Sequence, residues 1–339
     1  MLLAARVDGT ATVMLTGPET VGYAEVVTAR AAVGEVLAID ELAHPDEEYP
    51  TISTSSGLAT LRQMFVGARR IAVLGAGAVP SPLWQQVIAP LAAEGREIAS
   101  GDEVAYTLRT VKTPAEQGVI DEAYRVARLG LEAAVAAIRP GATEREVAAA
   151  AEGAMRAAGA EGFGIDTMVA SGVTNAAPIL ARSSFRKIRA EDLVSVTVAP
   201  RYEGYHAALA RPFLFRPNRE VEHAVDTARL GQRAALEHFR IGTEGRDSAR
   251  ALRDVFDAAS TGAELPYVPV HSIGVIEFEP PIFGSTSEVE IQEGMALSID
   301  AALFHADWGG LRIEDGFTIR SGRAEPRFPD YEAMVPVFI

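Results

Sequence analysis

Apolar and polar residues alternate along two neighbouring segments of the chain, residues 193–199 and 205–213. A period of two is the pattern of a half-buried β-strand, and Glu203 and Gly204 between the segments are typical of a turn. The pattern therefore predicts two strands joined as a hairpin.

The two faces of this hairpin carry different side chains. Val194, Val196 and Val198 share one face, which the alternation assigns to the core. The other face carries small residues, Thr197 on the outgoing strand and Ala208 on the returning strand. A sheet that lines an active site is expected to hold charged groups on such a face, so these positions are unexpectedly bare.

Before residue 110, short apolar stretches alternate with helical patterns, as is typical of an α/β domain. The elements expected there are the strands LLAARV, TATVML, EVLAI, RIAVLG and EIAS and helices near 19–32, 57–68 and 81–94. Gly75 and Gly77 follow a strand, as in a dinucleotide-binding turn. Pro80 stands where the third glycine belongs, which favours an ordinary strand-to-helix turn.

Two capping boxes open the second half of the chain. Thr113 with Glu116 and Thr143 with Glu146 have the spacing that starts helices. Further elements expected there are strands near 167–171, 193–199 and 205–213, helices 219–240 and 246–260, and strands near 271, 296–301 and 311–319. Helices first and sheet later indicate an α+β domain.

Composition narrows the class of protein. Of the 339 residues, 48% are hydrophobic and 23% are charged, which is enough to bury the cores of two domains. No apolar run reaches the roughly 18 to 20 residues of a membrane span, and an Asp-Gly pair interrupts the apolar start. We therefore expect a cytoplasmic protein without a membrane partner.

Charge and cysteine content restrict the partners further. The net charge of −15 disfavours nucleic acid, whose phosphates are bound by clustered Lys and Arg. Cysteine is absent, so any metal would have to be bound by His and carboxylate.

Several segments carry a family resemblance. They are VKTPAE, IRPGATEREV, VASGVTNAAP, the hairpin itself, HSIGVIEFEPP, EGMALSIDAAL and LRIEDGFTI, in this order between residues 110 and 320. The chain resembles the pita-bread family of methionine aminopeptidase, Xaa-Pro aminopeptidase, prolidase and the metal-free creatinase. The resemblance implies an α+β pita-bread domain over 113–339, a creatinase-type α/β domain over 1–112, and a homodimer.

The resemblance also implies what the bare face of the hairpin has lost. The family's metallopeptidases bind two divalent cations through two Asp, one His and two Glu residues. At these positions the chain has Thr197, Ala208, His271, Asp300 and Glu314, in that order. Because two carboxylates are missing, we expect no dinuclear metal centre and no other cofactor.

Two further histidines of the family are replaced. Leu180 stands at the place of the creatinase catalytic base, and Phe278 stands where a substrate-facing His lies. Neither side chain can transfer a proton, so the resemblance implies neither a dinuclear peptidase nor a creatinase. Phe278 is expected to make the substrate pocket more apolar.

The retained groups His271, Asp300 and Glu314 allow three interpretations. They can form a metal-free acid/base site, in which the two carboxylates split their pKa values and the His moves protons. They can also be a buried relic of a lost site, or the ligands of a single cation. The corresponding functions are a hydrolase or lyase acting on a C–N bond of a small molecule, an inactive peptidase used as a binding module, and a mononuclear metalloenzyme.

Five residues near these segments are candidates for substrate contacts. Arg182, and to a lesser degree Arg211 and Arg312, can clamp a substrate carboxylate, whereas the commoner role of such an Arg is to balance buried carboxylates. Tyr205 and His206 occupy positions where the family commonly has Tyr and His. For Tyr205 a structural role is the favoured interpretation.

Overall fold

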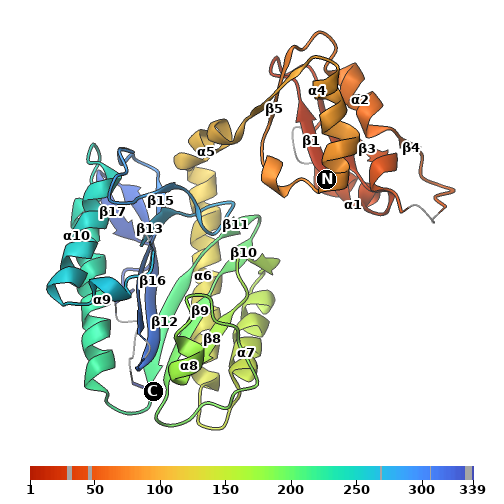
Figure 1. The fold of residues 1–339 in the computed structure, drawn as a ribbon. Helices are drawn as coiled ribbons and strands as arrows, with labels where there is room; N and C mark the ends of the chain where they lie inside the picture. Colours follow the sequence, from red (N-terminus) through yellow and green to blue (C-terminus); the bar gives the residue numbers. More distant parts are fainter. Residues whose placement is uncertain (29–32, 45–47, 268, 306, 333–337) are drawn as a thin grey trace. The chain divides into compact units, whose positions relative to one another are not determined.

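The computed structural model of the chain describes residues 1–28, 33–44, 48–267, 269–305, 307–332 and 338–339 (Figure 1). The chain divides into two compact units, Met1–Ala105 and Tyr106–Ile339. The domain boundary that the sequence predicts, after residue 112, lies between α5 (Asp102–Thr110) and α6 (Pro114–Ala137). No helix in the described part of the chain combines the length and apolar character needed to cross a membrane.

The first unit contains the predicted alternation of strands and helices. In chain order its main elements are β1 (Leu2–Ala5), β2 (Thr12–Thr16), α1 (Val21–Thr28), β3 (Glu35–Ile39), β4 (Thr54–Ser55), α2 (Gly57–Met64), β5 (Arg70–Val73), α3 (Ser81–Leu83), α4 (Ala89–Ala93) and β6 (Glu97–Ser100). β1 is antiparallel to β2, whereas β2, β3 and β4 are parallel, and β5 pairs with β6 in parallel. The helix predicted over 19–32 is seen as far as Thr28, and its last positions lie outside the described residues.

The second unit begins with the two predicted helices, and both capping boxes are confirmed. The side chain of Thr113 accepts from the Glu116 N–H at 3.3 Å, and Thr143 accepts from Glu146 at 3.2 Å. The other elements are α7 (Glu144–Ala157), β7 (Gly162–Phe163), β8 (Met168–Ser171), α8 (Gly172–Ala176), β9 (Leu193–Val198), β10 (Pro200–Tyr202), β11 (Tyr205–His206), β12 (Leu209–Leu214), α9 (Arg219–His238), α10 (Gly245–Ala258), β13 (Val270–Ser272), β14 (Glu279–Ile282), β15 (Ala296–His305), β16 (Gly309–Arg320) and β17 (Arg323–Pro326).

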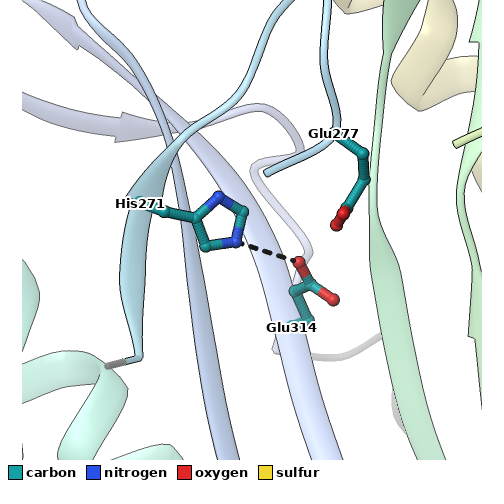
Figure 2. A group of neighbouring side chains, drawn as sticks. All are labelled: His271, Glu277 and Glu314. Atoms are coloured by element: carbon teal, nitrogen blue, oxygen red, sulfur yellow. Dashed lines mark ion pairs between the residues drawn. The ribbon is translucent and has the colours of Figure 1, made fainter. Parts of the chain in front are cut away.

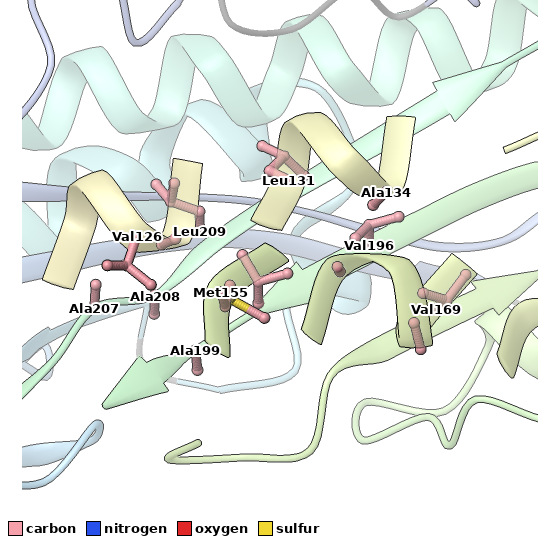
Figure 3. Close-up of a cluster of buried hydrophobic side chains, with 14 of the residues drawn as sticks. Val126, Leu131, Ala134, Met155, Val169, Val196, Ala199, Ala207, Ala208 and Leu209 are labelled. Atoms are coloured by element: carbon pink, nitrogen blue, oxygen red, sulfur yellow. The ribbon is translucent and has the colours of Figure 1, made fainter. Parts of the chain in front are cut away.

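One large sheet organises this unit. Its strand order is β14-β13-β15-β16-β12-β9-β8, with β17 beside β16, and β11-β10-β7 form a smaller sheet. α6 and α7 pack on the part of the sheet formed by β8, β9 and β12, where the buried cluster of Figure 3 includes Val126, Leu131, Met155, Val169 and Val196. α9 and α10 cover β15 and β16 (Figure 1). The predicted α+β architecture is confirmed.

The hairpin of residues 193–213 also forms, with one difference. β9 and β12 are antiparallel and pair Thr197 with Ala210, and the turn residues Glu203 and Gly204 have φ angles of 47° and 82°. The returning strand, however, is two short strands rather than one. Ala208 lies between them, fully buried in the core under α6 and α7.

Candidate active site

Two carboxylates of the site are placed by one antiparallel strand pair. β15 and β16 set Asp300 directly opposite Glu314, and side chains at paired positions share a face of the sheet. The neighbouring residues Ile299, Ala301 and Ile313 belong to the core under α9 and α10. Because successive side chains alternate between the two faces, the carboxylates point to the opposite face.

His271 reaches Glu314 of β16 from β13, on the far side of β15. β13 pairs His271 with Ser298 of β15, and the Ser298 hydroxyl donates to Glu314 Oε1 at 2.7 Å. The imidazole Nδ1 lies 2.9 Å from the carbonyl oxygen of Ser272 and donates to it, which leaves Nε2 facing Glu314 Oε1 at 3.8 Å. This is an ion-pair distance rather than a hydrogen bond, and both side chains are buried.

A third group, Glu277, joins this pair from the loop between β13 and β14. One ligand atom each of His271, Glu277 and Glu314 lies within 4.8 Å of the others, and Figure 2 shows the Glu277 carboxylate directed towards Glu314. The sequence did not assign a role to Glu277. The sequence pointed to Glu277 only through its position beside Phe278. Strand pairing could not place it, because Glu277 lies in a loop whose path the strands do not fix.

Burial and charge separate the pKa values of these three groups. Burial, with the nearby Glu314 charge, raises the pKa of Glu277 to about 7. Burial raises the pKa of Glu314, but His271, Arg312 and Ser298 together outweigh it and the pKa is lowered. Burial lowers the pKa of His271, but Glu314, Glu277 and the Ser272 backbone together outweigh it and the pKa is raised. The site therefore combines a His271–Glu314 ion pair with a carboxyl group that titrates near neutral pH.

Asp300 is held by other partners. Tyr267 donates its hydroxyl hydrogen to Asp300 Oδ2 at 2.5 Å, and Arg312 Nε lies 3.3 Å from Asp300 Oδ1. Burial raises the pKa of Asp300 to about 6, although Arg312 acts in the opposite direction. The sequence did not indicate Tyr267, which lies in the segment before β13.

Arg312 is engaged on several sides. Its Nε donates to the Tyr267 hydroxyl at 3.1 Å, and its Nη2 donates to the carbonyl oxygen of Ile179 at 3.2 Å. Together with its ion pair to Asp300, these contacts neutralise and orient the guanidinium. The predicted role of Arg312 in binding a substrate carboxylate stays a prediction.

The two residues that replace family histidines lie at exposed positions. The Phe278 ring centroid is 4.2 Å from that of His271, and Phe278 is 44% exposed. Leu180 is 66% exposed. Neither side chain is buried so that it fills the site, although the Phe278 ring makes the surroundings of His271 more apolar.

The other residues predicted to bind substrate have contacts with residues outside the His271, Glu277 and Glu314 group. The Arg182 side chain is 78% exposed and forms an ion pair with Asp166. The Tyr205 hydroxyl donates to Glu116 at 2.9 Å, and His206 is buried against a backbone carbonyl. Their roles in substrate binding stay predictions.

Arg211 serves the core rather than the candidate site. Its side chain is buried, and Nη2 donates to Asp315 Oδ1 at 2.5 Å. Nη1 donates to the backbone carbonyl oxygens of Ala210 and Glu314 at 2.8 and 2.9 Å.

The residues at the five metal-ligand positions do not fit a dinuclear centre. Thr197 and Ala208 offer no carboxylate, and Ala208 is part of the apolar core. Asp300 is paired with a guanidinium, which repels a cation. Among the described residues, the group whose ligand atoms converge is His271, Glu277 and Glu314, whereas the sequence predicted His271, Asp300 and Glu314 for a single cation.

A small cavity lies where the hairpin face is bare. Its volume is about 20 Å³, and its lining includes Thr197, Ile179, Phe304 and Arg312. A space of this size holds about one water molecule.

Sequence comparison finds similarity to two Xaa-Pro dipeptidases. It is 29% identical over 231 residues to the Xaa-Pro dipeptidase of Pyrococcus furiosus, which covers 68% of this chain and 66% of that protein. It is 28% identical over 225 residues to the Xaa-Pro dipeptidase of Pyrococcus horikoshii, which covers 66% and 64%. The matched region thus spans slightly less than two thirds of the length of these relatives.

Solved structures share the fold across nearly the whole chain. The prolidase of Pyrococcus horikoshii OT3 has a TM-score of 0.79 at 22% identity and covers 94% of this chain and 85% of its own. The X-Pro aminopeptidase of Thermotoga maritima has a TM-score of 0.74 at 22% identity and covers 94% and 85%. At such identities the likeness shows the fold alone.

The family itself is established by the match of residues 118–321 to the model of metallopeptidase family M24. These residues form most of the second unit and include β13, β15 and β16, which carry the site. The chain therefore belongs to metallopeptidase family M24 and has the pita-bread fold.

Proposed function

We propose that this chain is a hydrolase that cleaves a C–N bond of a small molecule by acid/base chemistry at His271, Glu277 and Glu314, without a dinuclear metal centre. One observation carries the proposal: the Glu277 carboxylate lies within 4.8 Å of the His271–Glu314 ion pair. Membership of a hydrolase family supports the reaction class. Titratable groups whose environments separate their pKa values are typical of paired acid and base roles.

The three groups can be given complementary roles. Glu277, as a carboxylate, takes a proton from a water molecule while the water oxygen bonds to the substrate's carbonyl carbon. The C–N bond then breaks, and the leaving nitrogen takes the proton from Nε2 of protonated His271. The proton held by Glu277 passes back to His271, which restores both groups. Glu314 keeps His271 protonated and oriented.

Asp300, which the sequence predicts to be catalytic, is a positioning residue in this proposal. It forms a neutral group with Arg312 and Tyr267 beside the reacting groups. Asp300 of β15 pairs directly with Glu314 of β16. The contacts of Asp300 with Arg312 and Tyr267 therefore hold the part of the two strands that carries Glu314.

The binding-module interpretation depends on a pocket filled by the replacing side chains. Leu180 and Phe278 are 66% and 44% exposed, so they do not close the site. A buried cluster of charged groups also has no use in a binding module, because burying charges is unfavourable unless they are paired.

A mononuclear cation site is the second candidate, and the convergence of ligand atoms favours it. One imidazole and two carboxylates form a set that binds divalent transition metals. Chelation separates the two candidates, because acid/base hydrolysis by the side chains alone does not require a bound cation.

The test is a mass-spectrometric screen of small amides and Xaa-Pro dipeptides with chelator-treated protein. Glu277→Gln and Glu314→Gln remove charge and basicity with little change of shape. For a substrate found in the screen, we expect each to slow turnover by about 10²- to 10⁴-fold while the protein stays folded.

Glu237→Gln, at an exposed position of α9, is the matched control and should not change the rate. Full activity of both site variants, and of His271→Ala, would refute the acid/base roles. Loss of stability without any change in turnover would identify the cluster as a relic.

A further inference from the structure

A second cavity, of about 280 Å³, lies beside α10 in the same unit. Its lining is mostly apolar and includes Leu265, Pro266 and Pro269. Arg253 of α10 and Ser285 add polar groups, and Tyr267 completes one wall. Apolar cavities of this size with a few polar groups are typical of small-molecule sites.

Arg253 is the charged residue of this lining. Its Nη1 donates to the carbonyl oxygen of Gly262 at a long 3.4 Å, and no ion pair with a carboxylate is found for it among the described residues. The guanidinium therefore keeps donors for a ligand. A guanidinium beside an apolar wall matches a carboxylate attached to an apolar body.

Tyr267 connects this cavity to the candidate active site. The residue lines the cavity, whereas its hydroxyl donates to Asp300 Oδ2 at 2.5 Å and accepts from Arg312 Nε at 3.1 Å. A ligand that contacts Tyr267 therefore touches a side chain that is hydrogen-bonded to Asp300, the positioning residue of the site.

We propose that this cavity binds a small monocarboxylate with an apolar body, anchored by Arg253, and that its occupancy alters the hydrogen bond between Tyr267 and Asp300. Such a ligand acts on the active site without entering it. The effect requires that the ligand has different affinities for the chain with the Tyr267–Asp300 hydrogen bond unaltered and for the chain with this bond altered. A change at the Tyr267–Asp300 hydrogen bond must then alter the affinity for the ligand by the same factor.

The test uses the full chain with benzoate as the probe and benzamide as its uncharged analogue. Calorimetry should show saturable binding of benzoate, and weaker binding of benzamide by about tenfold or more. Arg253→Gln should weaken benzoate binding by a similar factor. Arg219→Gln, at the exposed start of α9, removes the same charge outside the cavity and should leave benzoate binding unchanged.

The coupling is read from the ¹³Cζ signal of Tyr267 in labelled protein, assigned with Tyr267→Phe. We expect this signal to move as benzoate saturates the wild-type chain. Equal affinity for benzoate and benzamide, or equal benzoate binding by Arg253→Gln and wild type, would overturn the site. Saturable binding with a stationary Tyr267 signal would overturn the coupling. The comparison of benzoate with benzamide in the wild type stands even if Arg253→Gln does not fold.

Discussion

Two neighbouring carboxylates on β16, Glu314 and Asp315, point to opposite faces of the sheet and meet different surroundings. Asp315 accepts from Arg211 Nη2 at 2.5 Å and from Gln232 Nε2 at 3.1 Å. Both of its oxygens have charged or polar donors inside the core. This is the arrangement of a structural ion pair.

Glu314 has fewer close partners. It accepts from Ser298 at 2.7 Å, but His271 stays at 3.8 Å and Glu277 brings a second carboxylate to the same place. The group is buried yet incompletely paired. The comparison teaches that the number of close donors, rather than burial, distinguishes a buried charge that stabilises the fold from one that is available for chemistry.

The largest effect is expected from breaking the structural pair. Arg211→Met leaves Asp315 buried without its cation, so we expect the free energy of unfolding to fall by about 3–5 kcal/mol. Urea unfolding measures this loss. The double variant with Asp315→Leu should recover much of it, because no unpaired charge then remains. Unchanged stability of Arg211→Met would contradict the view that Asp315 forms a structural ion pair, in contrast to Glu314.

A smaller effect of opposite sign is expected at the site. Burial raises the folded-state pKa of Glu277 from 4.5 to about 7, so the folded chain binds more protons than the unfolded chain between these values. The stability that this proton contributes is present below pH 4.5 and is lost as the pH rises towards 7.

Glu277→Gln lacks this titration, so its stability relative to the wild type should increase by about 2 kcal/mol between pH 4.5 and pH 8. This value is below the full value of the shift because Glu277 is partly exposed. Urea unfolding at several pH values measures it. Parallel stability curves for the two proteins would show that Glu277 is not perturbed by the site.

The smallest effect is expected for Tyr267→Phe, which removes one hydroxyl from the group around Asp300. Loss of this hydrogen bond should lower the free energy of unfolding by about 1 kcal/mol. The pKa of Asp300, already raised to about 6 by burial, should rise further, because the Tyr267 hydroxyl stabilises the carboxylate. Titration of the Asp300 carboxyl by ¹³C NMR measures the shift, and an unchanged or lower pKa would contradict the assigned donor.

Much of the fold around the site was predictable because regular patterns specify it, including the strands near 271, 296–301 and 311–319 that carry the site. The alternation over residues 193–213 predicted the hairpin, and the two capping boxes predicted α6 and α7. The core role of Arg211 had a signal as well. Arg211 shares its strand face with Leu209 and Phe213, and both of these lie in the core.

The remaining parts of the site were not predictable because they lie outside regular strands. Glu277 belongs to a loop and Tyr267 to the segment before β13, so no periodicity fixes their direction. The resemblance grouped His271, Asp300 and Glu314. In the structure His271 lies 3.8 Å from Glu314, and Asp300 pairs with Glu314 across β15 and β16. The Asp300 carboxylate instead contacts Arg312 and Tyr267, and only the distances in the structure identify these two residues as its partners.

The most direct test of the acid/base account is the turnover rate of chelator-treated wild-type protein, with metal content determined by elemental analysis in the same sample. The account predicts that hydrolysis continues when the protein holds far less than one divalent cation per chain. Two cations per chain retained after dialysis, or activity that disappears on chelation and returns with an added divalent cation, would contradict it.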